Sequence, residues 1–478
     1  MLARMHSIRK SSRVLKVMSL VMATFLFDAC SSMGVSTKNA PLKAGFNVKK
    51  VVLKNGLTVL VAPNPKLPIV SYYTLFDVGG RDEGPGTTGA THFLEHMMFK
   101  GAKKYGPGEF DSQLERSGGV TNAYTTNDMT VYYQNIPVEF LEKMIDMEAD
   151  RLQNLLLEPV SFESERQVIF EERKMRYENS PDGLIFLALM KKVFAGTPYG
   201  NSVIGEESDL KALTRDQMMV FFKNFYVPNN AIVAIAGDVD PDKVIKMIEE
   251  KYGSIPMKTD LAELKKSSSS SEVFKSQAEF GKEYKYYATN PIPKFVMAFQ
   301  GERLGVRKAY VMDLLAMILG NGGSSYLTQK YVKSDHPMLS EISLANFNLI
   351  HSGVFYFAGE LMEGKSVEEV KTQIQNDFKQ MCDEAIDKRA LQKAKNQILA
   401  SGYNQLKTNA GVASTIVRNE KWHGDYNYGL KEMEMYNSIS ENEVQIACRE
   451  VLEESKSIFI STWDKYPKEV VTKTVEKK

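Results

Sequence analysis

Two histidines and a glutamate within five residues have the spacing in this sequence that most directly suggests chemistry. His92 and His96 are four residues apart in the segment His-Phe-Leu-Glu-His, with Glu95 between them. On a helix, residues at this spacing lie on one face about 6 Å apart, so both imidazoles can bind one metal ion. The chain has only six histidines, and finding two of them here favours a metal site over a chance pair.

Glu95 lies immediately before His96, so its carboxylate points towards the same metal without having to bind it. This position suits a general base that takes a proton from a water molecule, because zinc lowers the pKa of bound water to about 7. The commoner zinc-peptidase motif places its glutamate after the first histidine, and here that order is reversed. The segment therefore predicts a zinc centre of the inverted H-x-x-E-H type.

A catalytic zinc ion usually has three protein ligands and one open position, so a carboxylate from another element is expected. The predicted helix over 161–177 and the residue after it are rich in candidates. These are Glu163, Glu165, Glu171, Glu172 and Glu178. Glu165 and Glu172 are two turns apart and share a face. The spacing leaves open which of them binds the metal, and helices of this kind often simply expose their acids to solvent.

The elements around this motif form an alternating α and β pattern. Asn55-Gly56 lies between β-rich runs at 51–53 and 57–61, which predicts a hairpin, and further strands are predicted over 69–78 and 231–236. Helices are predicted over 92–99, 107–117, 138–155, 161–177 and 215–224, and another from Pro241.

Residues 258–276 interrupt this pattern with two lysines and five consecutive serines, a composition typical of a flexible linker. The alternation then returns. Strands are predicted over 294–300 and 353–360, and helices over 308–319, 366–384, 388–406 and 441–453. We therefore predict a metal-binding domain over 46–257 and a second domain without a metal over 277–465, followed by a polar tail over 466–478. The similar patterns suggest duplication, although no residue-level repeat is visible.

The N-terminus is typical of an export signal. Basic residues between Arg4 and Lys16 precede an apolar run over 17–27, which is shorter than the roughly 20 residues needed to span a bilayer. Cys30 follows the run as in a lipoprotein processing site. This predicts a signal peptide over 1–29, a tether over 30–45, and a periplasmic protein attached to the membrane by a lipid. Asp28 departs from the usual lipoprotein pattern, so a plain secretory signal is the alternative.

Bulk composition excludes one class of partner. The 478 residues carry 60 basic and 59 acidic side chains, and no basic block occurs beyond the N-terminus, so nucleic-acid binding is not expected. A chain of this length is expected to form two to four domains. Beyond Cys30, the remaining cysteines are Cys382 and Cys448. Whether they pair is left open by the sequence.

Several blocks, in order, resemble the insulinase/pitrilysin family of zinc peptidases, in the bacterial branch similar to the mitochondrial processing peptidases. They cover most of residues 46–255, and a weaker match continues to about 465. The blocks are Gly80–Glu83, Thr88–Gly101, Asn122–Thr125, Thr130–Tyr133, Glu165–Ile169, Pro198–Gly200, Tyr226–Asn230 and Ala236–Val239. The resemblance implies two related α+β domains, each a mainly antiparallel sheet with helices packed on one face.

The resemblance also implies roles for individual residues. His92, His96 and Glu172 would bind one zinc ion per chain, with Glu95 as the general base. Glu165, which begins the block that Glu172 ends, would orient one of the ligands.

Asn122 and Ala123 match the edge-strand segment where family members bind a peptide by strand addition. On local sequence alone, Asn122 would also suit a turn.

One block departs from the family pattern. Many relatives carry an arginine in the second domain where this chain has Tyr326, and a later tyrosine whose position falls near 337–340, a segment without one. We therefore expect a zinc endopeptidase acting on peptides or unfolded segments, in a homodimer or heterodimer with a same-fold chain that supplies the arginine and tyrosine. The alternative is a non-catalytic assembly subunit of the same fold.

Overall fold

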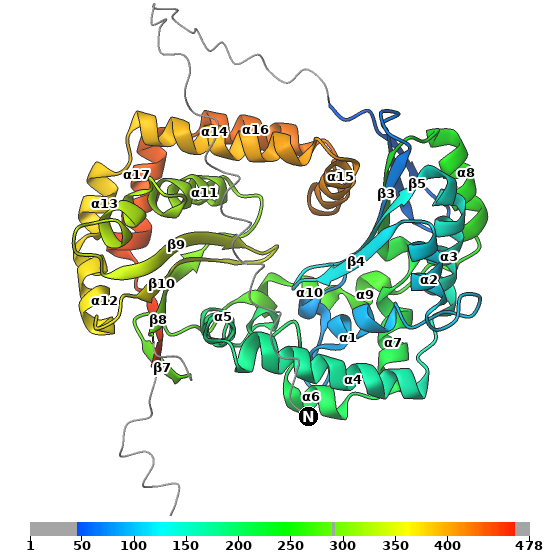
Figure 1. The fold of residues 1–478 in the computed structure, drawn as a ribbon, viewed down its shortest axis with the longest axis horizontal. Coiled ribbons are helices and arrows are strands. Elements are labelled where there is room, and N and C mark those ends of the chain that lie inside the picture. The colour runs from blue at the N-terminus through cyan, green and yellow to red at the C-terminus, as the bar shows by residue number, and fades with distance from the viewer. Residues whose placement is uncertain (1–44, 289–291, 464–478) are drawn as a thin grey trace, which may run out of the picture. The chain divides into compact units, whose positions relative to one another are not determined.

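Two β-sheets organise the computed structural model, which describes residues 45–288 and 292–463. The predicted signal peptide, Cys30 and the polar tail lie outside the described residues. Helices cover both sheets (Figure 1). In the described part of the chain, every helix is too short or too polar to cross a bilayer.

The first sheet has six strands in the order β1-β2-β6-β3-β5-β4, and β2–β6 is its one parallel pair. The bounds are β1 Lys49–Val52, β2 Thr58–Pro63, β3 Ile69–Phe76, β4 Val120–Thr125, β5 Thr130–Pro137 and β6 Ala231–Gly237. The predicted hairpin is confirmed as β1–β2. Its turn contains Gly56 at a φ of 84°, and a Cβ there would lie 2.5 Å from Asn229, so only glycine fits.

The second sheet repeats the topology of the first. Its strands are β7 Glu283–Tyr287, β8 Lys294–Gly301, β9 Leu339–Asn348, β10 Gly353–Leu361 and β11 Ile458–Trp463. They pair in the order β7-β11-β8-β10-β9, again with one parallel pair, β7–β11. When β2 to β6 are matched in chain order with β7 to β11, corresponding strands have the same neighbours. Each corresponding pair is also parallel or antiparallel in both sheets. This identity of topology supports duplication where the residues show no repeat.

Each sheet packs most of its own helices on one face, as predicted. In the first half these helices begin and end at α1 Ala90–Met97, α2 Glu109–Arg116, α3 Leu141–Asn154, α4 Pro159–Arg173, α6 Glu207–Ala212, α7 Arg215–Phe225 and α8 Pro241–Tyr252. In the second half they are α11 Arg307–Gly320, α12 Val367–Asn376, α13 Phe378–Glu384, α14 Lys388–Gln405, α16 Tyr428–Ser438 and α17 Glu441–Arg449. Cys382 of α13 and Cys448 of α17 form a disulfide.

The opposite face of each sheet receives a helix from the other half. α5 (Pro181–Val193) packs Ile185 and Leu189 against Val296 of the second sheet. α15 (Asn409–His423) packs Ile416 against Leu60 of the first sheet, and Figure 1 shows it beside β3. Because each half covers the other's sheet, the two halves share apolar cores.

The segment predicted to be a flexible linker contains helical turns. These are α9 Leu261–Leu264, α10 Lys266–Ser269 and a 3-10 turn over Ser271–Phe274. Lys265 between them is only 8% exposed, and its ammonium lies 2.6 Å from the carboxylate of Asp77. Composition alone did not reveal this ordering, because the contacts that hold the segment, such as Lys265 with Asp77 and Ser268 with Asp82, join residues far apart in the sequence.

Candidate metal centre

α1 is positioned by a buried carboxylate from the loop before it. Its N-cap residue is Gly89, at a φ of 87°, which has no side chain to cap the helix. Glu83, 6% exposed, replaces that cap by accepting hydrogen bonds from the backbone N–H groups of Gly89 at 2.8 Å and Thr91 at 2.7 Å. A carboxyl group at a helix N-terminus satisfies free N–H groups. Burial raises the pKa of Glu83 to about 8, and the hydrogen bonds from Thr91 and Gly89 oppose that shift.

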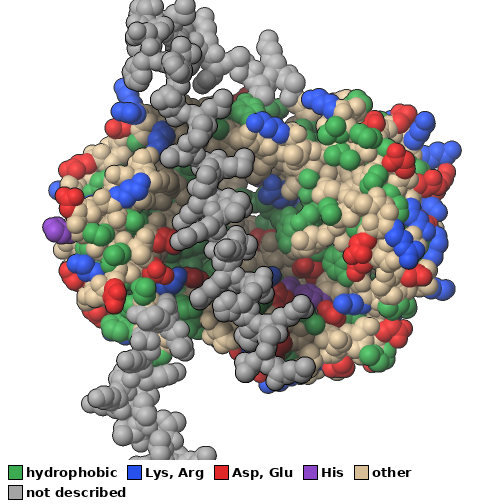
Figure 2. Space-filling model, viewed as in Figure 1, with side chains coloured by type: hydrophobic (Ala, Val, Ile, Leu, Met, Phe, Trp, Pro, Cys, Tyr) green, Lys and Arg blue, Asp and Glu red, His purple; other side chains and the backbone are tan. Residues whose placement is uncertain are grey.

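The three predicted ligands come together where α1 packs on α4. Oε2 of Glu172 lies 3.7 Å from Nε2 of His92 and 3.4 Å from Nε2 of His96, and the three ligand atoms lie within 4.8 Å of one another. Tetrahedral zinc with bonds of about 2.1 Å needs ligand atoms roughly 3.4 Å apart. Two imidazole nitrogens and one carboxylate therefore fit a zinc ion in chemistry, and the two distances to Glu172 are close to the spacing that zinc needs. Figure 2 shows histidine and acidic side chains together over α1.

The charge states of His92 and Glu172 suit metal binding. Burial, followed by the nearby His96, lowers the pKa of His92 to about 4, which leaves its imidazole neutral. The hydrogen bond from His96 lowers the pKa of Glu172 against the opposing effect of burial. Nε of Arg176 lies 3.1 Å from the other oxygen of that carboxylate. A neutral imidazole and an ionised carboxylate are the forms that bind metal.

Glu165 lies on the far side of His96 from the ligand cluster. Its Oε2 is 3.1 Å from Nδ1 of His96, and its Oε1 is 2.6 Å from the ammonium of Lys100. Burial lowers the pKa of His96, but the hydrogen bonds with Glu172 and Glu165 outweigh it and raise the pKa overall. Helical spacing could not distinguish Glu165 from Glu172. In the structure, Glu172 lies in the ligand cluster, whereas Glu165 contacts the other ring nitrogen of His96.

Glu95 stands beside the cluster and contacts the edge strand. Its carboxylate accepts a hydrogen bond from the hydroxyl of Thr125, the last residue of β4. Burial raises the pKa of Glu95, and the bond from Thr125 opposes the shift. No role was predicted for Thr125 from the sequence, although Thr125 closes the block that begins at Asn122. The position of Thr125 next to the candidate substrate-binding residues was the feature of the sequence that could have indicated a role.

Asn122 and Ala123 lie on β4, which among the described strands pairs only with β5. The Asn122 side chain is exposed, and its Oδ1 accepts a hydrogen bond from the Ala123 N–H at 2.8 Å. α1 packs next to β4. An open strand edge therefore runs beside α1, the helix that carries His92 and His96.

Tyr326 follows α11 in the second half. Its hydroxyl accepts a hydrogen bond from Lys330 at 3.2 Å, and the same ammonium lies 2.9 Å from Asp377. The side chain is partly buried against the second core. These contacts give Tyr326 a packing role in this chain.

Comparison with known protein families matches both halves. The model described as insulinase (peptidase family M16) matches residues 58–207, and the model described as the peptidase M16 inactive domain matches residues 212–398. The first match contains the candidate ligand cluster with Glu95, and the second begins at the end of α6, before the last strand of the first sheet. Two α+β halves of matching topology, with the candidate metal cluster in the first half, are the class that fold and site define.

Individual relatives agree with this class. An uncharacterized zinc protease of Rickettsia bellii is 30% identical over 358 residues, which cover 75% of this chain and 83% of the relative. The mitochondrial-processing peptidase subunit beta of Blastocladiella emersonii is 31% identical over 204 residues, 43% of this chain and 44% of that one. A protease crystal structure from Helicobacter pylori superposes with a TM-score of 0.81 at 25% identity, covering 88% of this chain and 100% of the other. The chain belongs to the insulinase family, peptidase family M16, as its motifs predicted.

Proposed function

We propose that this chain is a zinc-dependent endopeptidase that hydrolyses peptides or unfolded polypeptide segments. The observation that carries the proposal is the cluster of His92, His96 and Glu172 ligand atoms within 4.8 Å of one another, with Glu95 beside it. Relatives of this chain are named zinc proteases, which supports the same chemistry.

In this mechanism the protein groups hold the metal and move protons. His92, His96 and Glu172 hold one zinc ion per chain, and Glu165 orients the His96 ring. When bound, zinc supplies a Lewis acid that polarises a carbonyl and lowers the pKa of water. Glu95 takes the proton of the attacking water and passes it to the leaving amine. The raised pKa of the Glu95 carboxyl suits a group that must both accept and release a proton.

Substrate binds in this proposal along β4, where backbone groups at the open edge near Asn122 and Ala123 pair with an extended peptide. Backbone pairing depends little on side chains, so it suits an enzyme that accepts many sequences. Thr125 at the end of the same strand contacts Glu95, so a peptide on β4 would pass the catalytic carboxylate.

We also propose that the enzyme works as a pair of same-fold chains, either two copies or two different proteins. The support is Tyr326, which stands where many relatives carry a substrate-binding arginine. The relative from Blastocladiella is named as one subunit of a peptidase. If the pure chain cleaved peptides at full rate and gained nothing from a neighbouring same-fold protein, a heterodimer would be ruled out.

Export to the periplasm, with a lipid on Cys30, is part of the same proposal. Its support within the described residues is the Cys382–Cys448 disulfide, because disulfides persist mainly in oxidising compartments. Metabolic labelling with a fatty acid, compared between the natural chain and Cys30→Ala, tests the lipid attachment.

The decisive experiment separates metal binding from proton transfer. Glu95→Gln should keep zinc and lose peptide cleavage, whereas His96→Ala should lose both, measured by metal content and by a quenched fluorescent peptide. Full turnover by Glu95→Gln would disprove the assignment. Tyr326, in place of the arginine of many relatives, favours one alternative function, that of a non-catalytic assembly subunit. For such a subunit we expect no cleavage by the natural chain, either alone or with a same-fold partner.

A further inference from the structure

The residues of β4, the strand proposed to pair with substrate, do little to fix its position by packing. Each of them is exposed or half-buried. The turn after the strand is different, because Asn127, Asp128 and Met129 are only 5–6% exposed. Thr125, the last residue of β4, donates its hydroxyl hydrogen bond to Glu95. The position of the buried turn therefore decides where Thr125 meets the candidate general base.

The turn holds its shape through its own hydrogen bonds. Oγ1 of Thr126 accepts from the backbone N–H groups of Asp128 and Met129, both at 3.1 Å. The N–H of Thr126 donates to the carbonyl of Met129 at 2.9 Å. Thr125 and Thr130, on either side of the turn, pair in the sheet. Because the turn is short and internally bonded, a displacement of Asp128 is passed on to Thr125.

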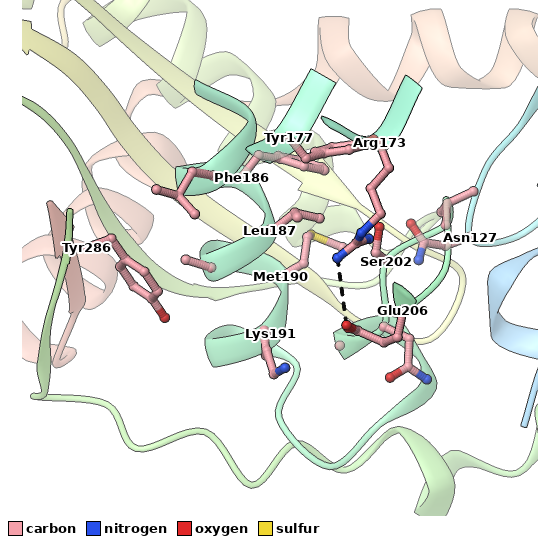
Figure 3. Close-up of a pocket in the computed structure, with 15 residues that line it drawn as sticks. Asn127, Arg173, Tyr177, Phe186, Leu187, Met190, Lys191, Ser202, Glu206 and Tyr286 are labelled. Carbon is pink, nitrogen blue, oxygen red and sulfur yellow. Dashed lines mark ion pairs between the residues drawn. The ribbon is translucent and has the colours of Figure 1, made fainter. Parts of the chain in front are cut away.

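On one side the turn packs closely on the loop that leads to α1. The N–H groups of Gly80 and Arg81 donate to the carbonyls of Thr126 at 3.1 Å and Asn127 at 2.9 Å. A Cβ on Gly79 would lie 2.5 Å from the carbonyl oxygen of Thr126, so this approach needs glycine. On another side, Asn127 lines a pocket of about 180 Å³ together with residues of α5, as Figure 3 shows. Packing leaves space there, so polar contacts matter more for the position of the turn.

The side chain of Asp128 joins the turn to the second half of the chain. Its Oδ1 accepts from the guanidinium of Arg81 at 2.9 Å and from the hydroxyl of Tyr199 at 2.7 Å. Its Oδ2 accepts from the backbone N–H of Ile350 at 3.1 Å, in the turn between β9 and β10. The Tyr199 hydroxyl accepts in turn from the N–H of His351 at 3.3 Å. One carboxylate thus connects the end of β4, the loop before α1 and the second half.

These contacts are of a kind that holds a group firmly. Asp128, Arg81 and Tyr199 are 6%, 5% and 0% exposed, so water competes little for them. Arg81 and Asp128 form an ion pair, and charge-assisted hydrogen bonds are about twice as strong as neutral ones.

We propose that Asp128 is a positioning residue of the candidate active site, which ties the end of β4 to the turn between β9 and β10 and so keeps Thr125 against Glu95. The proposal rests on the endopeptidase function, in which Glu95 transfers the proton. Such chemistry is sensitive to placement, because a displacement of about 1 Å can lower a rate about 100-fold. The second half of the chain then contributes to catalysis within the same chain.

Cleavage of a quenched fluorescent peptide by the active enzyme, alone or paired with a same-fold chain, tests the proposal. Asp128→Ala should lower kcat by about 10- to 100-fold. Its zinc affinity, measured by competition with a chelator, should stay unchanged, because the predicted ligands lie on α1 and α4. Tyr199→Phe keeps the ring and removes one donor to Asp128, so it should lower kcat by about twofold to tenfold. Tyr331→Phe is the control, because it removes a buried hydroxyl that donates to Asp377, away from β4, and should leave kcat unchanged.

Double variants separate positioning from a general loss of structure. Thr125→Val removes the hydroxyl that contacts Glu95 and keeps the shape of the side chain. If Asp128 acts through this contact, adding Asp128→Ala to the Thr125→Val chain should lower kcat little further. Tyr199→Phe combined with Thr125→Val gives the same comparison if Asp128→Ala does not fold, as judged by circular dichroism.

An unchanged kcat in the folded variants would overturn the positioning role and leave the peptidase function standing. Losses that multiply in the double variants, a loss confined to KM, or an equal loss in Tyr331→Phe would overturn it too. If the natural chain cleaved no peptide in either arrangement, the endopeptidase proposal would fail, and this inference with it.

Discussion

Oε2 of Glu165 lies 3.1 Å from Nδ1 of His96, on the edge of the ring opposite the nitrogen that faces the ligand cluster. A carboxylate at this atom favours the tautomer with the proton on Nδ1, which leaves Nε2 free to bind metal. The ammonium of Lys100, 2.6 Å from the other oxygen of Glu165, holds that carboxylate in place. A chain of three side chains thus fixes the orientation of one predicted metal ligand, His96.

Removal of this support should weaken metal binding without abolishing it. Glu165→Ala is expected to lower zinc affinity by about 10- to 100-fold, the usual effect of removing such a partner, as measured by competition with a chelator. The matched control is Glu171→Ala on the same helix, whose carboxylate is exposed and pairs with Lys174. An unchanged zinc affinity in Glu165→Ala would show that His96 needs no such orientation.

Glu83 should stabilise α1 and, through it, the metal centre. Glu83→Ala leaves the N–H groups of Gly89 and Thr91 buried without their acceptor, so we expect a loss of roughly 2–3 kcal/mol in the free energy of unfolding. Urea denaturation with and without zinc would measure it. Glu109→Ala is the control, because its carboxylate accepts from the Gly106 N–H at the exposed start of α2 and should contribute under about 1 kcal/mol. Equal losses in both variants would contradict the role of Glu83.

The part of the site that the sequence reveals is the part fixed within single helices. His92 and His96 share a face whatever surrounds α1, and Glu95 follows from its position next to His96. The same local geometry puts Glu165 and Glu172 on one face of α4. Which of the two faces the histidine pair depends on how α4 packs on α1. Helical spacing does not contain this information, and the choice of Glu172 came from the resemblance to the family motif.

Other features depend on contacts between distant residues. No helix was predicted over the residues of α5, and its packing on the sheet of the other half depends on residues far away in the sequence. β4 reads Val-Thr-Asn-Ala-Tyr-Thr, with two polar residues followed by two apolar ones, so it lacks the strict alternation that marks a strand. Because the residue pattern did not predict this strand, the hydrogen bond from Thr125 to Glu95 could not be predicted either. Lys265 was assigned to a linker because its partner, Asp77, is 188 residues away.

Asp77 should make stability depend on acid pH. Burial alone would raise its pKa, but the ammonium groups of Lys421 and Lys265 and the guanidinium of Arg81 hold the pKa well below its usual range. These partners lie 2.7, 2.6 and 2.7 Å away. A carboxylate with a depressed folded pKa contributes stability that is complete well above the unfolded value of about 3.9 and is lost as the pH falls below it.

Asp77→Asn should therefore lower the free energy of unfolding by roughly 3 kcal/mol at neutral pH, because it leaves the ammonium groups of Lys265 and Lys421 without their carboxylate partner. The difference from the natural chain should shrink as the pH falls below about 4. Urea denaturation across that range measures both effects. Asp242→Asn removes an exposed pair with Lys49 and should cost under about 1 kcal/mol. A constant difference at all pH values would contradict the assigned charge state.

The disulfide between α13 and α17 should be a major source of stability in the second half. Cys382 and Cys448 are 66 residues apart and fully buried. Closing a loop of this length restricts the unfolded chain and contributes about 4 kcal/mol in the chain-entropy description. The double variant Cys382→Ala/Cys448→Ala should lose stability by that order, measured by urea denaturation. A reducing agent should destabilise the natural chain and leave the double variant unchanged. If both cysteines of the purified, denatured chain reacted with a maleimide before any reduction, the bond and its stabilising effect would be refuted together.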